Sequence, residues 1–218
     1  MNTIDENKIK QYQQLHQEDP SYGSTSLKFI DEISVMIDAL KPKSILDYGC
    51  GKGSLIEEIE RRYPEIICYR YDPSIPEYST LNVQTADLVI NTDVLEHIPV
   101  ADIDAVLREI ASISNNAYFN LHHGKAATML PSGENAHCTV RSPSWYRKKI
   151  SNYFDYIELL PGRRYITRVA ITFKLHDTDR KKYLDIINRN KINTPFSLSL
   201  RFFVKNILRD IFGITINK

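Results

Sequence analysis

The chain has 218 residues, of which 42% are hydrophobic and 25% are charged, as in an ordinary globular domain. A formal net charge of +1 gives no overall basis for binding nucleic acid or a membrane. The three cysteines, Cys50, Cys68 and Cys138, contain no C-x-x-C pair, which argues against a disulfide framework and against a zinc site of cysteines. A polar N-terminus and the lack of a run of transmembrane length lead us to expect a cytoplasmic protein.

The first forty residues predict two helices. Residues 5–18 are polar with sparse apolar positions, which indicates a loosely packed helix. Residues 24–40 carry apolar side chains at helical spacing and predict a second, better packed helix. Lys41, Pro42 and Lys43 end this helix directly before an apolar run that reads as a strand.

Residues 44–53 predict a strand that breaks into a glycine-rich loop, and a helical pattern follows at once. Strand, glycine loop and helix form the nucleotide-binding opening of a doubly wound α/β sheet. The acid Asp47 stands two residues before the first of Gly49, Gly51 and Gly53, giving D-x-G-x-G-x-G and not the dinucleotide pattern G-x-G-x-x-G. An acid there would repel a pyrophosphate but suits a ligand that carries an ammonium and a sulfonium.

A second strand, over residues 66–71, ends in Asp72. An acid about 20 residues past the glycines is placed to bind the ribose hydroxyls of an adenosine. The alternative is that Asp72 is a turn acid before Pro73. Residues 73–86 hold two prolines and little β pattern, so we expect a third strand there to be shortened or missing.

A buried strand at residues 88–90 leads into Asp-Val-Leu-Glu-His-Ile at 93–98, and a helix and another strand follow over 103–121. Together with the glycine loop and Asp72, this stretch resembles class I S-adenosylmethionine (SAM)-dependent methyltransferases, in particular a bacterial and phage subgroup with the D-Y-G-C-G-K-G and D-V-L-E-H-I motifs. The resemblance covers residues 44–121. It implies an α/β, Rossmann-like, doubly wound and mostly parallel sheet with an antiparallel edge strand and extra C-terminal helices.

The same resemblance implies which residues contact SAM. An N-terminal segment often covers the SAM pocket in this family, and it would bring Tyr22 to the ligand. The expected SAM contacts are Asp47, Gly49, Cys50, Gly51, Gly53, Asp72, Asp93, Val94, Leu95 and Tyr22. We expect residues 1–176 to form the methyltransferase domain, with the N-terminal helices as its cap, and residues 177–218 to form a helical extension.

Three of the six histidines fall between residues 122 and 137, after the strand at 117–121. A hydroxyl that accepts a methyl group must lose its proton, and histidine is the side chain best suited to take it near neutral pH. His137, His123 and His122 are therefore candidates for the general base. The alternative is that they are hydrogen-bonded structural residues.

Asp93, Glu96 and His97 raise the question of a metal. Their spacing resembles the magnesium-binding segment of ubiquinone-biosynthesis O-methyltransferases and of small-RNA 2′-O-methyltransferases, which carry Glu where this chain has Asp93. On the first turn of a helix the three side chains would share a face, and His122 or His123 would complete a Mg²⁺ site. The alternative is that Glu96 and His97 are structural, as in metal-free members.

The C-terminal third predicts a helix over residues 142–154, an antiparallel pair of strands over 156–160 and 165–175, and a polar, basic helix over 178–190. Residues 200–211 carry an apolar stripe opposite Arg201, Lys205 and Arg209. Such a helix packs on a core, mediates dimerisation, or holds the protein peripherally at the inner face of the membrane.

These features predict methyl transfer from SAM to a hydroxyl of a small molecule or glycan. The Asn-Pro-Pro-Tyr signature of many DNA methyltransferases is absent, so DNA is not the expected acceptor. Alternatives are a metal-assisted nucleic-acid 2′-O-methyltransferase and a non-catalytic SAM-binding or scaffold protein. An NAD-type oxidoreductase is disfavoured by the glycine spacing.

Overall fold

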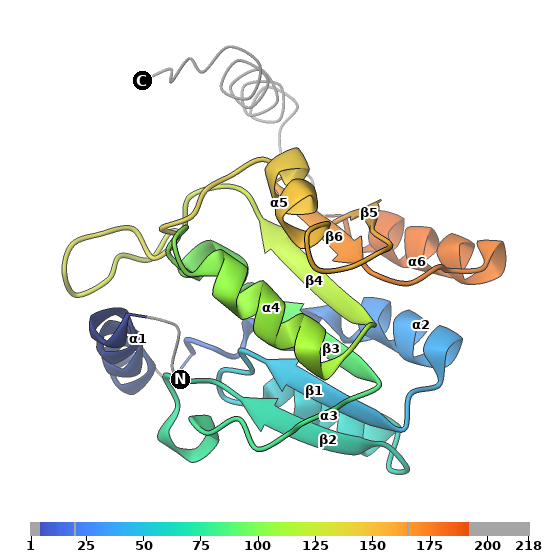
Figure 1. Cartoon of the computed structure of the whole chain (residues 1–218), viewed down its shortest axis with the longest axis horizontal. Helices are drawn as coiled ribbons and strands as arrows, with labels where there is room; N and C mark the ends of the chain where they lie inside the picture. Colours follow the sequence, from blue (N-terminus) through green and yellow to red (C-terminus); the bar gives the residue numbers. More distant parts are fainter. Residues whose placement is uncertain (1–4, 20, 165, 192–218) are drawn as a thin grey trace.

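The computed structural model describes residues 5–19, 21–164 and 166–191. Within them a six-stranded sheet lies between two layers of helices (Figure 1), with strand order β2-β1-β3-β4-β6-β5. Strands β1 to β4 run parallel, while β6 runs antiparallel to both β4 and β5. The predicted α/β, mostly parallel sheet with an antiparallel edge is confirmed.

From α2 to β5 the helices and strands alternate, except that no α-helix separates β2 from β3. The strands are β1 (Ser44–Tyr48), β2 (Ile67–Tyr71), β3 (Leu88–Thr92), β4 (Ala117–His122), β5 (Glu158–Pro161) and β6 (Thr167–Ile171). The α-helices are α1 (Glu6–Glu18), α2 (Ile30–Leu40), α3 (Ser54–Arg62), α4 (Ile103–Ile113), α5 (Pro143–Ile150) and α6 (Asp177–Arg189). Short 3₁₀ turns are η1 (Thr25–Phe29), η2 (Pro76–Tyr78) and η3 (Leu95–His97).

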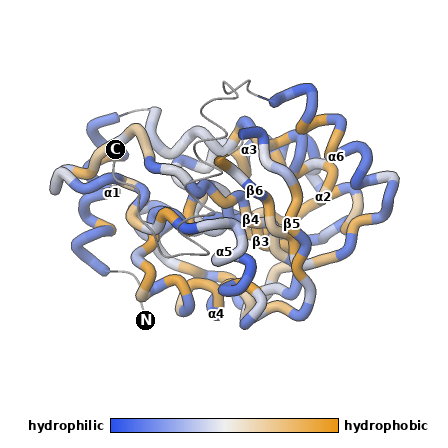
Figure 2. Tube along the Cα trace, turned by 90° about the horizontal axis from the view of Figure 1, so that it is seen from above, coloured by the Kyte–Doolittle hydropathy of each residue, from blue (hydrophilic) through white to orange (hydrophobic). Residues whose placement is uncertain are grey.

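Two hydrophobic cores lie on the two faces of the sheet. Helices α2, α3 and α6 bury apolar side chains against one face, and α4 and α5 against the other. Helix α3 illustrates how the sequence directs this packing, because its apolar residues Leu55, Ile56 and Ile59 recur at helical spacing and are completely buried. Figure 2 shows hydrophobic residues along the central strands, whereas α1 at the periphery is mostly hydrophilic.

The strand expected to be shortened or missing at residues 73–86 is indeed missing. Between β2 and β3 the described chain forms only turns and η2, so β2 is the edge of the sheet. Pro73 and Pro76 explain this, because proline has no N–H for a strand ladder and fixes its own φ angle.

The segment after β3 differs from its prediction. A helix was expected to begin at Asp93, but only η3 forms there, over Leu95–His97. Asp93 itself has φ 54°, in the left-handed region. The chain therefore turns sharply at Asp93, so Asp93, Glu96 and His97 do not share one face of a helix.

Helix α6 packs on α2, with Tyr183 and Ile187 buried in the same core. The Tyr183 hydroxyl donates a hydrogen bond of 2.7 Å to the Pro161 carbonyl oxygen, which ties α6 to β5. Within the described residues, no helix combines the length and the apolar character needed to cross a bilayer. The predicted amphipathic helix at 200–211 lies outside the described residues.

Candidate active site

A cavity of about 550 Å³ opens at the carboxyl ends of the parallel strands, where doubly wound sheets bind their ligands. The glycine loop after β1, Asp72 after β2, the turn after β3 and the end of β4 all reach it. The predicted site residues that line the cavity are Tyr22, Gly49, Cys50, Gly51, Asp72, Asp93, Val94, His97, His122 and His137.

The glycine loop is held by its neighbours on both sides. The backbone N–H groups of Gly49 and Cys50 both donate to the Tyr71 carbonyl oxygen, at 2.7 and 3.1 Å, which ties the loop to β2. Gly51 has φ 54°, and a Cβ atom there would fall 2.4 Å from the Gly23 carbonyl oxygen. Only glycine permits this close approach, by which the N-terminal segment covers the loop.

Asp72 holds a fixed orientation at the cavity wall. One carboxylate oxygen accepts from the Gly51 N–H at 2.9 Å, and the other from the backbone N–H and the hydroxyl of Ser74, at 2.9 and 2.6 Å. The oxygen that accepts from Gly51 keeps one further lone pair. The carboxylate is thus preorganised to accept hydrogen bonds from a ribose, as its position in the sequence predicts.

Three of the predicted SAM contacts do not line the cavity. Gly53 is the N-cap of α3 with φ 80°, and Leu95 is completely buried in the core. Asp47 is also completely buried, and neither of its oxygens has a hydrogen-bond partner among the described residues. Burial raises the pKa of this carboxyl to about 7. Direct ligand contacts from these residues therefore find no support in the geometry.

The cavity is roofed by two segments that are remote in sequence. Helix α1 and the loop after β4 meet where the Tyr12 hydroxyl lies 2.8 Å from the Ala136 carbonyl oxygen and 3.2 Å from that of His97. Lys8 and Glu134 add an ion pair, and Leu15 packs with Leu130 and Ala136. Helix α1 is thus part of the site and not a detached surface helix.

Several cavity residues were not predicted from the sequence. His16, Lys28, Lys125 and Arg164 all line it. Lys28 comes from η1 and forms an ion pair with Asp93 at 3.3 Å. No local motif marks these positions, because they come from α1, from η1 and from two loops that only the tertiary fold brings together.

His122 and His97 lie on either side of His137 in the cavity wall, with ring centroids 4.6 and 4.7 Å from the His137 ring. Burial lowers the pKa of His97 to about 3 and that of His122 to about 4, and it also lowers the pKa of His137. All three imidazoles are neutral near pH 7 and are able to accept a proton or bind a metal.

His123 does not take the position expected of a general base. It is only 5% exposed and is absent from the cavity lining, whereas its neighbour His122 lines the cavity. Successive residues at the end of a strand point to opposite faces, so only one of two adjacent histidines faces the cavity. His122 and His137 remain as candidates for the base.

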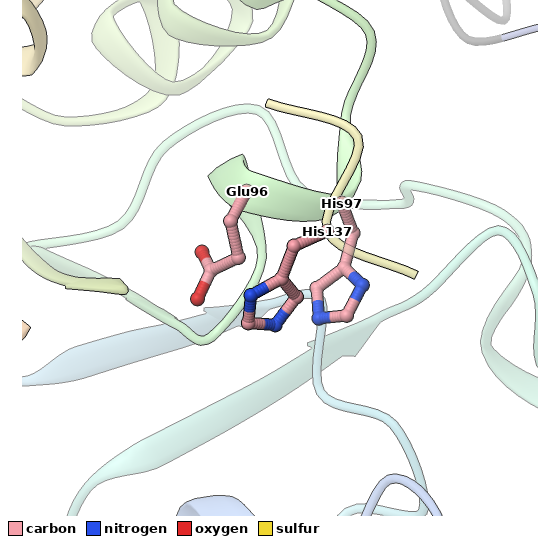
Figure 3. A group of neighbouring side chains, drawn as sticks. All are labelled: Glu96, His97 and His137. Carbon is pink, nitrogen blue, oxygen red and sulfur yellow. The ribbon is translucent and has the colours of Figure 1, made fainter. Parts of the chain in front are cut away.

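The predicted metal ligands are also rearranged. Asp93 does not join Glu96 and His97, because it turns toward Lys28. His137 takes its place: ligand atoms of Glu96, His97 and His137 all lie within 4.8 Å of one another. Figure 3 shows Glu96 and His97 on one turn and His137 on a separate segment, with all three side chains pointing the same way.

The expected Mg²⁺ does not suit this set of donors. Magnesium prefers six oxygen ligands, whereas two of the three side chains here offer imidazole nitrogen. Glu96 is completely buried, and burial raises the pKa of its carboxyl well above the usual range. Neither Glu96 carboxylate oxygen has a hydrogen-bond partner among the described residues.

Comparisons with known proteins bear on this site. The family model "Methyltransferase domain" matches residues 16–146. Ribosomal RNA small subunit methyltransferase A of Phytoplasma australiense is 28% identical in a 109-residue alignment that covers 48% of this chain and 38% of that protein. The chain thus spans well under half of this curated relative.

Two solved structures have a similar fold. The mitomycin 7-O-methyltransferase MmcR aligns with a TM-score of 0.56 and 18% identity, over 73% of this chain and 59% of that one. The N-terminal domain of EvdMO1, crystallised in the presence of SAH and D-fucose, aligns with a TM-score of 0.50 and 16% identity, over 67% of this chain and 82% of that one.

Proposed function

The chain belongs to the methyltransferase domain family, and on that premise we propose that it transfers a methyl group from SAM to a hydroxyl of a small molecule or glycan. The observation that carries this proposal is the composition of one cavity. A glycine loop and an oriented acid lie in it together with three neutral imidazoles. The first two features suit an adenosine and the imidazoles suit proton removal.

The cofactor half of the cavity would be formed by Gly49, Gly51 and Asp72, with Tyr22 from the N-terminal segment. Asp72 would accept hydrogen bonds from the ribose hydroxyls. The loop backbone approaches a ligand closely because Gly49 and Gly51 carry no side chains. SAM supplies an electrophilic methyl on a sulfonium.

The acceptor half would be formed by the end of β4 and the loop that follows it. His122 and His137 line this wall, and either imidazole suits the removal of a hydroxyl proton as the oxygen attacks the methyl. The rest of the catalytic effect is positioning: the acceptor oxygen has to be held in line with the methyl and the sulfur. The roof of α1 and the loop would limit the access of water to this alignment.

RNA is the second acceptor class, because the curated relative is by name a ribosomal RNA methyltransferase. Within RNA, the ribose hydroxyls would be favoured over the base atoms as acceptors, because the imidazoles in the cavity suit the deprotonation of a hydroxyl. EvdMO1, whose structure was determined in the presence of SAH and D-fucose, guides the choice of acceptors to be tested.

The test begins with calorimetric titration of the purified chain with SAM, SAH and, separately, NADH. Micromolar binding of SAM and SAH without binding of NADH is expected. Transfer of radiolabelled methyl is then measured with a panel of monosaccharides, sugar nucleotides, phenols and RNA. Absence of SAM binding overturns the proposal. Binding with methyl transfer to RNA alone overturns the acceptor class, and binding without transfer to any of these acceptors points to the non-catalytic alternative.

A further inference from the structure

The imidazoles of His97 and His137 are held in one tautomer by the backbone. Nδ1 of His97 lies 3.1 Å from the Ala136 carbonyl oxygen, and Nδ1 of His137 lies 2.7 Å from that of Gly124. A carbonyl oxygen only accepts, so each Nδ1 must carry the proton and donate it. Each Nε2 is left with a free lone pair, as in histidines that bind metals and donate their other nitrogen to a carbonyl.

Glu96 supplies an independent observation. Its side chain is completely buried beside the two imidazoles. Among the described residues its carboxylate makes no hydrogen bond of normal geometry, although the backbone N–H groups of Glu96 and His122 lie near it. No ion pair within the described part of the chain includes it. A carboxyl group buried without an ion-pair partner is costly to ionise, so it either keeps its proton or is neutralised by a cation.

We propose that Glu96, His97 and His137 bind a divalent transition metal, such as Mn²⁺, Co²⁺ or Zn²⁺, in the wall of the cavity. Two imidazole nitrogens and one carboxylate are donors that these ions accept and that Mg²⁺ disfavours. Bonds of about 2.1 Å place donors no more than about 4.2 Å apart. The three side chains, within 4.8 Å of one another, therefore need only a small adjustment.

The location of this site deepens the proposed function, on which this step rests. His97 and His137 line the cavity, so the open coordination positions of the ion face the acceptor. Coordination there lowers the pKa of an acceptor hydroxyl. With His137 as a ligand, His122 takes the hydroxyl proton, while the O–CH₃ bond forms and the S–CH₃ bond breaks to release SAH.

The Tyr12 hydroxyl completes the support of the site. It donates to the Ala136 carbonyl oxygen, which also accepts from Nδ1 of His97. Helix α1 thus helps to orient a ligand that lies on η3. Such outer contacts tune affinity, and their loss typically lowers metal affinity about 10- to 100-fold.

The test uses the full chain, stripped with EDTA and titrated calorimetrically with Co²⁺, Mn²⁺ and Mg²⁺. One equivalent of Co²⁺ is expected, bound much more tightly than Mg²⁺, with an absorption band in the visible range. Glu96→Gln and His137→Asn should each weaken Co²⁺ binding by about 100-fold or more. His176→Asn, at an exposed histidine before α6, and Asp93→Asn should leave it within a few-fold of the unaltered chain.

Equal affinity for Mg²⁺ and Co²⁺, no Co²⁺ binding, or unchanged binding by Glu96→Gln would each overturn the proposal. Should a variant not fold, the NMR spectrum of the unaltered Co²⁺ chain decides instead: two paramagnetically shifted imidazole N–H signals are expected, and their absence counts against the site. Metal binding is measured without SAM. If SAM binding and methyl transfer persist in EDTA, the metal site has no role in the reaction, and the proposed methyltransferase activity stands. If the chain binds Co²⁺ but not SAM, the metal site stands, and the proposed methyltransferase activity is contradicted.

Discussion

Gly49 lies against Val94 so closely that a Cβ atom at position 49 would fall 2.4 Å from a methyl carbon of Val94. Gly49 also has φ 86°, a backbone conformation that side chains rarely adopt. This contact joins the glycine loop after β1 to the turn after β3. The two strongest motifs of the sequence are therefore one packed unit at the cavity wall.

Gly49→Ala should disturb that unit. Strain at the positive φ and the clash with Val94 together should reduce the free energy of unfolding by about 2–4 kcal/mol and weaken SAM binding at least about tenfold. Gly133→Ala is the matched control, because Gly133 has φ 82° with nothing within 4 Å of a Cβ atom. It should lose only about 1–2 kcal/mol and bind SAM normally. Denaturant unfolding and calorimetry measure both; equal SAM affinity in the two variants would refute the role of the packed unit.

Asp72→Asn tests the cofactor half of the cavity. The amide group has an NH₂ in place of one oxygen that accepts hydrogen bonds, so both the bond from the Gly51 N–H and the proposed bonds from the ribose hydroxyls should weaken. SAM affinity should fall about 10- to 100-fold, in keeping with a lost charge-assisted hydrogen bond. Asp87→Asn is its control: Asp87 accepts from the backbone N–H groups of Lys43 and Ser44, at the start of β1. Asp87→Asn should lower the free energy of unfolding and leave the affinity for SAM unchanged. Weaker binding by both variants would point to a general loss of structure.

His122→Gln tests the general base. Removing a positioned base typically slows a reaction about 10²- to 10⁴-fold. The rate of methyl transfer should fall within this range while SAM affinity stays the same. His123→Gln changes the adjacent residue, which does not line the cavity, so its effect should be on stability and not on rate. The assignment fails if His123→Gln slows transfer as much as His122→Gln does.

Asp47 predicts a dependence of stability on pH. Its pKa is raised by burial from an ordinary value near 3.8 to about 7. Below about pH 4 the carboxyl is protonated in the folded and the unfolded chain. As the pH rises toward 7, only the unfolded chain ionises, so stability is lost progressively, by an amount on the order of 4 kcal/mol at most, and it stays lost above pH 7.

Asp47→Asn removes this titration because the amide is neutral at every pH. The variant should therefore gain stability relative to the unaltered chain between pH 5 and pH 8.5. Other buried acids, Glu96 among them, titrate both in the unaltered chain and in Asp47→Asn, so their contributions cancel in the difference between the two free energies of unfolding. Denaturant unfolding at the two pH values gives the measurement, and a difference that does not change with pH would show that Asp47 is ionised in the folded protein.

Most of the fold could be predicted from the sequence because its signals are local. Leu55, Ile56 and Ile59 repeat at helical spacing, and residues 88–90 form an apolar run of strand length. Pro73 and Pro76 marked the place where a strand is lacking. The turn at Asp93 could not be predicted, because Asp-Val-Leu-Glu-His-Ile suits a helix start locally and only tertiary contacts impose φ 54°.

The site was predicted in part. Sequence position was enough to place Gly49, Gly51 and Asp72 at the cavity, because the carboxyl ends of parallel strands meet at one edge of the sheet. The pairing of His137 with Glu96 was not readable, because it depends on a long loop that returns over η3. The positions of Lys28 and Arg164 depend in the same way on the path of the chain between elements, which no local pattern encodes.

The roof of the cavity has a kinetic consequence. Helix α1 meets the loop after β4 through hydrogen bonds of Tyr12, an ion pair of Lys8 with Glu134, and apolar packing of Leu15 against Leu130 and Ala136. The polar contacts contribute about 1 kcal/mol each and the buried leucine about 1.5–3 kcal/mol, so lifting the helix costs several kcal/mol. Turnover at about 10 per second corresponds to a barrier of about 16 kcal/mol. The free-energy cost of opening lies below this barrier, so α1 can lift once in each cycle, and SAH can leave by the same route through which the next SAM enters.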